Sequence, residues 1–456
     1  MNSRASRLPS LGCHGALLCG ALAIAAVNAA VPAVSADLAT TPAGTRWFAA
    51  AYQLACGPLQ LGAGRVADRR GQRGVLLGSL AVFAAGGLLA ATATDATSLV
   101  AARLVQGAGG SALSPVSLAL LLTLRDTEEG AAPRAVAGWV STAAAASCLG
   151  PLLGGLLTEL LGWRAVFTAL TVLALLTAGC LLSPRAAVTV PPPPREPLDA
   201  PGIALCAAAA TAALVTLTTP ATAVPAAGVL TVLVGLLVLR VRRVPHAALD
   251  TGLLRRPATR RALLVLLTLF AAHSAFTFQT AFVLTRAHGL GPFGAALATL
   301  PSAVPAVLTA RLAGTRSGDD GARPMRAGLL CVAVGLLTGC AGRCAPTPVP
   351  LLLCAFALMG CGLGLANGSA MTTIGTAGRS ARATATATTF AMLGGASGPA
   401  ATAASATLTA ALPTPCGPLP AGNPQEPQHA LPLIALTTLV LAFVLTRGRD
   451  GTRAPA

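Results

Sequence analysis

Ten residues, Gly64–Arg73, constrain this chain more than any other stretch. They separate two apolar segments, roughly 47–63 and 75–93, and read Gly-Arg-Val-Ala-Asp-Arg-Arg-Gly-Gln-Arg. Each segment is about long enough to cross a bilayer as a helix at ~1.5 Å per residue. A loop this short predicts two antiparallel helices that lie side by side. Its four arginines indicate that the loop faces the cytoplasm.

The composition is that of a membrane protein. Of the 456 residues, 54% are hydrophobic and only 10% are charged, and the mean hydropathy is +0.73. A soluble domain carries about 25% charged residues, so we expect an all-α integral membrane protein. Fourteen spans are predicted, with twelve or thirteen left open. The predicted spans are 11–31, 47–63, 75–93, 99–122, 135–157, 165–182, 202–219, 223–239, 262–284, 293–313, 326–341, 349–368, 384–411 and 430–446.

The net charge of +17 comes from arginine, since the chain contains no lysine. Such basicity can signal nucleic-acid binding, but the positions of the arginines favour membrane topology. With the N-terminus inside, 26 of the 31 arginines fall in inside loops, four fall outside, and Arg103 lies within a span. Arginines collect in cytoplasmic loops. We therefore expect no nucleic-acid partner, a place in the inner (plasma) membrane and both termini in the cytoplasm.

Loop composition divides the chain. Residues 1–36 resemble a signal peptide, but their apolar run is longer than usual, so we expect a retained first helix. A disulfide among Cys340, Cys344 and Cys416, which are predicted outside, is left open.

The expected units are a six-helix bundle (1–183), a Pro-rich cytoplasmic linker (184–200), two added transmembrane helices (201–240), an Arg-rich cytoplasmic connector (241–261), a second six-helix bundle (262–446) and a cytoplasmic tail (447–456).

Arg103 is the most informative single residue, in the pattern Leu99-x3-Arg103-x2-Gln106-Gly107-x-Gly109. An arginine inside a membrane helix costs roughly 2.5–3.5 kcal/mol on insertion scales, and it normally faces a cavity or a partner. Gln106 follows at i+3, so it lies on the same helix face.

A second pattern runs Gly150-Pro151-Leu152-Leu153-Gly154-Gly155. The proline is expected to break or kink the fifth helix, and the glycines Gly150, Gly154 and Gly155 are expected to admit close helix contact. Trp163-Arg164-x2-Phe167 follows at the start of the next helix.

These patterns, with Val27-Asn28-x-Ala30-x-Pro32 and Trp47-x4-Tyr52-x-Leu54, resemble the fourteen-helix drug:proton antiporter branch of the major facilitator superfamily over residues 22–170. The resemblance implies two six-helix bundles with two extra central helices, and a monomer. It also implies that the Gly150-Pro151 motif marks an exporter and that Arg103 takes part in proton handling. The loop would be a conformational latch, in which Asp68 accepts hydrogen bonds at a helix N-terminus or pairs with an arginine. The latch residues are Gly64, Arg65, Asp68, Arg69, Gly71 and Arg73.

The chain departs from the family at one position. Family members commonly carry a carboxylate five residues before the first-helix asparagine, where this chain has Ala23. No predicted span has an interior carboxylate. Proton coupling needs a group that titrates within the membrane, which leaves His273 as the main candidate. The other titratable candidates are His14, Asp37 and Glu159.

Polar and aromatic residues of the spans are candidates for substrate contact, with helix packing as the alternative for each one. A cavity without a fixed negative charge favours a neutral or anionic amphipathic substrate over a dication. The candidates are Asn28, Tyr52, Gln53, Gln106, Trp139 and Gln279, with Phe276 and Phe278 beside them.

The sequence therefore predicts a secondary transporter that exports drug-like or secondary-metabolite molecules by alternating access, coupled to proton antiport. An uncoupled facilitator and a degenerate membrane scaffold or sensor are the alternatives. An enzyme is not expected, because the spans offer no nucleophile–base pair. No cofactor and no metal site are expected, because Cys/His metal spacings are lacking.

Overall fold

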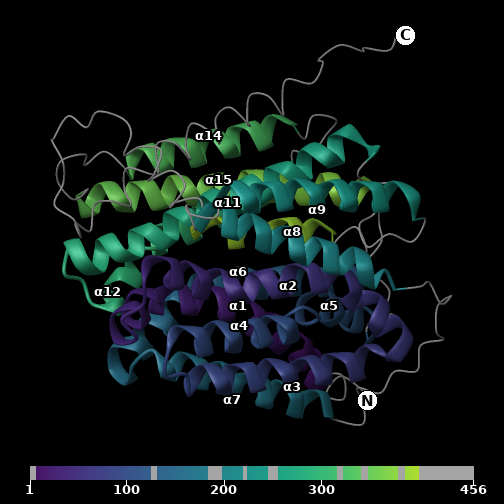
Figure 1. Ribbon diagram of the computed structural model, residues 1–456, viewed down its shortest axis with the longest axis horizontal. Helices are drawn as coiled ribbons and strands as arrows, with labels where there is room; N and C mark the ends of the chain where they lie inside the picture. The colour runs from purple at the N-terminus through teal and green to yellow at the C-terminus, as the bar shows by residue number, and fades with distance from the viewer. Residues whose placement is uncertain are drawn as a thin grey trace, which may run out of the picture.

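The computed structural model describes residues 7–124, 131–182, 198–218, 223–244, 255–315, 322–339, 348–377 and 386–399, and every regular element in these ranges is helical. Figure 1 shows the helices running side by side along one direction, with the first seven in its lower half. Because helices satisfy their own backbone hydrogen bonds, they are suited to an apolar surrounding.

The first seven helices enclose one apolar core, which includes Phe83, Leu113 and Phe167, each with no exposed surface. α2 and α3 are joined by a one-residue corner, and α4 and α5 by a two-residue turn. The helices are α1 (Arg7–Asp37), α2 (Pro42–Arg70), α3 (Gln72–Ala91), α4 (Ala96–Gly110), α5 (Leu113–Leu124), α6 (Ala131–Leu161) and α7 (Arg164–Leu182).

A second core forms in the other half of the molecule, around Phe276, Phe356 and Met359. A π-helical turn, Val283–Ala287, extends α11, and a short 3-10 turn, Leu300–Ser302, separates α12 from α13. The helices are α8 (Ala200–Thr218), α9 (Ala223–Arg243), α11 (Pro257–Phe282), α12 (Pro292–Leu297), α13 (Ala303–Thr315), α14 (Ala322–Thr338), α15 (Val349–Ala377) and a final helix over 386–399.

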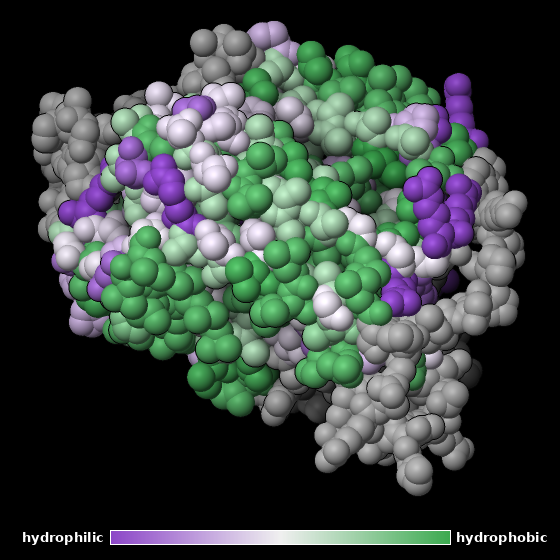
Figure 2. Space-filling view, turned by 90° about the horizontal axis from the view of Figure 1, so that it is seen from below, coloured by the Kyte–Doolittle hydropathy of each residue, from purple (hydrophilic) through white to green (hydrophobic). Residues whose placement is uncertain are grey.

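The surface has the character of a membrane protein. Eight helical stretches of the described chain are long and apolar enough to cross a bilayer, and leucines such as Leu88, Leu104 and Leu176 are exposed on them. Figure 2 shows a broad apolar band with hydrophilic residues gathered at its two ends. The chain is therefore a multi-pass membrane protein. The count of fourteen spans stays a prediction, because residues 400–456, which hold the last predicted span, lie outside the described residues. The three cysteines of the possible disulfide, Cys340, Cys344 and Cys416, also lie outside them.

The predicted ten-residue loop is wrong in extent. α2 continues through Arg70 and α3 begins at Gln72, so Gly71 alone separates them, with φ +89°. Glycine takes this conformation without the strain that a Cβ would add. Arg69 and Arg70 extend α2 because cations at a helix C-terminus interact favourably with its dipole, and Gly64 lies inside α2.

Two predicted spans are interrupted. The segment predicted as 99–122 divides into α4 and α5, and the segment predicted as 293–313 divides at Leu300–Ser302. Pro115 stands in the first turn of α5 and Pro301 in the 3-10 turn. Proline lacks the N–H that would continue the preceding helix, which explains both breaks. By contrast α6 remains helical through Pro151. The predicted break there is wrong, while a kink stays a prediction.

The pair α8 and α9 is held by an ion pair at the end near Gly71. Arg240 Nη2 lies 2.6 Å from Asp199 Oδ1, which also accepts the Gly202 N–H and so caps α8. Leu198 and Ile203 lie over Gly62 of α2. The arginines at the ends of α2 and α9 therefore gather on one side of the molecule. The six-helix division of the chain stays a prediction.

The crossing of α2 and α4 depends on a glycine. A Cβ added at Gly107 would collide with the backbone carbonyl of Tyr52, which leaves room only for hydrogen. Small residues at such crossings let membrane helices approach closely.

Gly107→Ala should therefore destabilise the protein, by about 1–3 kcal/mol as for other overpacked sites. Gly179→Ala is the matched control, because a Cβ at Gly179 meets no atom within 4 Å. That control should be neutral or slightly stabilising, since alanine is the better helix former. Thermal unfolding of both purified variants in detergent measures the difference, and equal midpoints would contradict the packing.

Candidate substrate and coupling site

Arg103 is buried, with 2% of its surface exposed, where α1, α2 and α4 meet. Its Nη1 donates to Gln106 Oε1 at 2.7 Å and its Nη2 donates to the Ala23 carbonyl oxygen at 3.0 Å. The guanidinium carbon lies 4.7 Å from the centre of the Tyr52 ring and 5.9 Å from that of Phe167. Neutral acceptors and aromatic faces thus surround this cation.

The contact with Ala23 falls at the position where the family resemblance leads one to expect a carboxylate. Here the guanidinium bonds to the backbone instead, and no carboxylate pairs with it among the described residues. Its Nε and the Nε2 of Gln106 have no hydrogen-bond partner there either. The positive charge is therefore held in place without being neutralised.

Tyr52 and Gln106 fit tightly into this cluster. Tyr52 is 1% exposed and packs edge-on against Phe83, with ring centres 6.4 Å apart. Gln106 is fully buried, and its side-chain amide lies beside Gly87 of α3. Two of the predicted substrate-contact residues are thus brought to Arg103.

The glycines around Pro151 lie at helix contacts. Gly150 faces Ala25 and Gly154 faces the backbone of Ala26, both on α1. Gly155 faces Pro292 and Ala296 at α12, in the other half of the molecule. The predicted close contacts around this motif are therefore present.

At the end opposite Gly71, Asp37 of α1 and Arg164 of α7 connect α1, α7 and the turn after α3. Trp163 Nε1 donates to Asp37 Oδ2 at 2.9 Å, and Arg164 Nη1 lies 2.8 Å from the same oxygen. Arg164 Nη2 also donates to the Ala93 carbonyl. This arrangement ties the end of α1 to the start of α7 and to the turn after α3. In that turn Asp95 caps α4, and the Ser98 N–H is the main cause that lowers the pKa of Asp95.

Hydrogen bonds and glycine contacts join the two halves in several regions of the described chain. At the Asp37 end, Glu159 Oε2 accepts the backbone N–H of Phe293 at 2.9 Å. Further along, Thr389 Oγ1 donates to the Gly57 carbonyl at 2.9 Å, and Gln53 lies against Gly395. Gln53 therefore sits at the junction of the halves rather than beside Arg103.

The latch residues have different surroundings. Arg73 donates from Nε and Nη2 to the carbonyls of Leu181 and Leu182, each at 2.8 Å, and so caps the C-terminus of α7. Arg65 is half-buried and Arg69 exposed in the last turns of α2. The side chain of Asp68 lies outside what the structure describes, so its latch role stays a prediction.

The remaining candidates are dispersed. His273 is half-buried on α11, and its Nδ1 has no hydrogen-bond partner in the described part of the chain. Gln279, 1% exposed, likewise has both amide atoms unpaired there. Trp139 donates to Ser117, and His14 lies 2.9 Å from Thr142 Oγ1.

Asn28 is half-buried on α1. Phe276 belongs to the second core, whereas Phe278 packs against the first.

The sequence of this chain matches the family model described as Major Facilitator Superfamily over residues 14–399. The chain belongs to this superfamily. Its fold agrees: a crystal structure of an auto-inhibited POT family peptide transporter superposes with a TM-score of 0.70 over 98% of this chain and 99% of that one, at 17% identity. The likeness at this identity concerns the fold alone.

Curated relatives within the superfamily include proteins named for export. The chain is 38% identical over 186 residues (40% of the chain) to the cephamycin export protein CmcT of Amycolatopsis lactamdurans. It is 39% identical over 160 residues (35%) to the puromycin resistance protein pur8 of Streptomyces alboniger, and 32% identical over 317 residues (68%) to the multidrug efflux pump LfrA of Mycolicibacterium smegmatis. The matches span 37%, 32% and 62% of these relatives, less than two thirds of each.

The bond between Arg103 and Gln106 can be measured directly. A double-mutant cycle of Arg103→Met and Gln106→Leu should show a favourable coupling of about 1.5–3 kcal/mol, as for a hydrogen bond to a charged group. The readout is unfolding in detergent. Arg103→Met with Trp139→Phe is the control pair, which should be additive because the two share no partner. Additivity in both pairs would contradict the geometry.

Proposed function

We propose that this superfamily member exports small drug-like or secondary-metabolite molecules across the plasma membrane, by alternating access and driven by proton antiport. The protein acts as a monomer with both termini in the cytoplasm. The observation that carries the proposal is the buried Arg103 at the junction of three helices, in a chain whose relatives are named for antibiotic and multidrug export.

Charge at the site supports a substrate class. Arg103 is a fixed cation, and no carboxylate offsets it among the described residues. In a low-dielectric surrounding a charge acts over a longer range than in water. Neutral and anionic amphiphiles are therefore favoured over cations.

The contacts between the halves support alternating access. Each half has its own core, and at the Asp37 end they meet through α6 and α12. Transporters of this type rock one bundle against the other around a central site. The Glu159–Phe293 contact would have to open when the substrate leaves on the outer side.

Uncoupled facilitated transport is the second candidate. Ala23 favours it, because the residue that pairs with Arg103 cannot take up a proton. Coupling then depends on another titratable group, and His273 is the intramembrane candidate with an unpaired ring nitrogen.

Efflux of fluorescent amphiphiles from an export-deficient bacterium separates these candidates. Wild type should extrude dye only while the proton gradient is intact. Arg103→Met should lose efflux at least about tenfold, as for a lost charged interaction worth ~1.4 kcal/mol or more. Arg243→Gln, an exposed arginine on α9, is the control and should keep it.

His273→Ala should keep transport down a concentration gradient and lose its dependence on the proton gradient. Efflux that survives collapse of the gradient in wild type would favour the facilitator. No efflux of any compound by a correctly inserted protein would contradict the proposal.

A reversible cross-link tests alternating access. Glu159 contacts Phe293 across the junction of the halves, so a short bis-methanethiosulfonate reagent should join Glu159→Cys to Phe293→Cys in a background without other cysteines. The cross-link should stop efflux and reductant should restore it, while the reagent should leave either single-cysteine variant unaffected. Full transport by the cross-linked protein would show that this contact need not open.

A further inference from the structure

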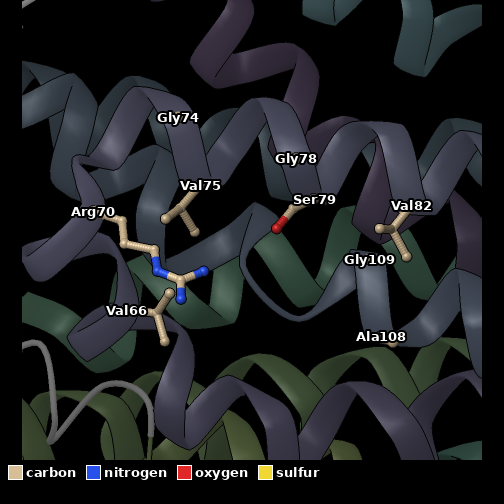
Figure 3. A pocket seen from close by; sticks show the side chains of 9 residues that line it. All are labelled: Val66, Arg70, Gly74, Val75, Gly78, Ser79, Val82, Ala108 and Gly109. Carbon is tan, nitrogen blue, oxygen red and sulfur yellow. The ribbon is translucent and has the colours of Figure 1, made fainter.

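A groove of about 390 Å³ lies on the membrane-facing side of the first half, away from Arg103. Its walls come from α2, α3 and α4 (Figure 3). The side chains of Val75, Ser79 and Val82 line one face of α3, and the guanidinium of Arg70 reaches over one end. The lining residues are Val66, Arg70, Gly74, Val75, Gly78, Ser79, Val82, Ala108 and Gly109.

The floor is open because of two glycines. A Cβ at Gly74 or Gly78 would meet no atom within 4 Å, and both residues are exposed. One turn of α3 separates them. Apart from Arg70 at one end and Gly109, the other lining residues are three valines, Ala108 and Ser79, whose hydroxyl is polar. The groove therefore fits an apolar chain rather than a polar solute.

Arg70 is the only charged residue that lines the groove. It is exposed and makes no hydrogen bond or ion pair with the rest of the described chain. Arg73, three residues later, is fully engaged with the carbonyls at the end of α7. One of the two neighbouring cations thus stabilises the fold, and the other is available to an external anion.

The dimensions match one leaflet of a bilayer. From Gly74 to Val82 the groove runs eight residues along α3, ~12 Å at ~1.5 Å per residue. Half of a hydrocarbon core of ~30 Å is ~15 Å. Arg70 stands at the end where the arginines of α2 and α9 gather, the cytoplasmic end by the positive-inside rule. The cation thus lies at headgroup depth and the valines at acyl depth.

We propose that this groove binds an anionic phospholipid of the cytoplasmic leaflet, with its phosphate at Arg70 and one acyl chain along Gly74, Gly78 and Val82. The cytoplasmic leaflet is rich in anionic lipid, and a basic residue near its surface attracts such headgroups. The inference rests on the orientation of the chain and not on export, so it holds or fails independently of the proposed function.

Native mass spectrometry of the full chain in detergent, titrated with dioleoyl phosphatidylglycerol or dioleoyl phosphatidylcholine, tests the site. Wild type should prefer phosphatidylglycerol. Arg70→Gln should weaken its binding about fivefold, the equivalent of ~1 kcal/mol for one basic residue at an anionic surface. Arg243→Gln removes an equal charge from the same end and should have no such effect. Inorganic phosphate should not displace the lipid.

A change of shape tests the acyl part. Gly78→Leu fills the floor and should reduce the binding of both lipids, whereas Gly179→Leu, at another open glycine, should not. A phosphatidylglycerol with a diazirine in its acyl chain should label peptides within 74–109. Equal binding by Arg70→Gln and Arg243→Gln, displacement by inorganic phosphate, or labelling elsewhere would overturn the proposal.

Discussion

A guanidinium buried within a membrane protein must be given hydrogen-bond acceptors, and the first half of this chain is arranged around that requirement. Arg103 receives one acceptor from its own helix, Gln106, and one from the backbone of α1, Ala23. Burying a charged group without partners costs far more free energy than burying a neutral polar group without partners. The hydrogen bond to Ala23 therefore holds α1 against α4. If the two helices separated, the buried guanidinium would lose one of its two acceptors.

This constraint links packing to transport. The rings of Tyr52 and Phe167 lie against the guanidinium, and Gly107 lets α2 come close enough for the first of them. The hydrogen-bond acceptors of the guanidinium are neutral, so no opposite charge offsets it among the described residues. We propose that the field of this cation reaches a substrate bound between the halves, so that Arg103, although buried, influences which molecules are accepted. In the proposed alternating-access cycle, the contact of Glu159 with α12 would break and re-form as the halves move.

Much of this was predictable from sequence, and the misses have identifiable causes. Hydropathy and arginine placement predicted a multi-pass helical protein, and the i, i+3 spacing placed Gln106 beside Arg103 because helix geometry is local. The interruptions at Pro115 and Pro301 were missed because apolar runs masked the proline signal. The contact with Ala23 and the capping of α7 by Arg73 join residues far apart in sequence. A backbone carbonyl carries no residue-specific signal, so no pattern could have found either one.

The central claim is that Arg103 acts as a cation without a paired carboxylate. Uptake into everted membrane vesicles of two compounds with one apolar scaffold, one bearing a carboxylate and the other an amine, tests it most directly. The account predicts that the anion is accumulated at least about tenfold more than the cation, a difference of ~1.4 kcal/mol, and that Ala23→Asp diminishes this preference. Equal or preferential accumulation of the cation by the wild-type protein would contradict it.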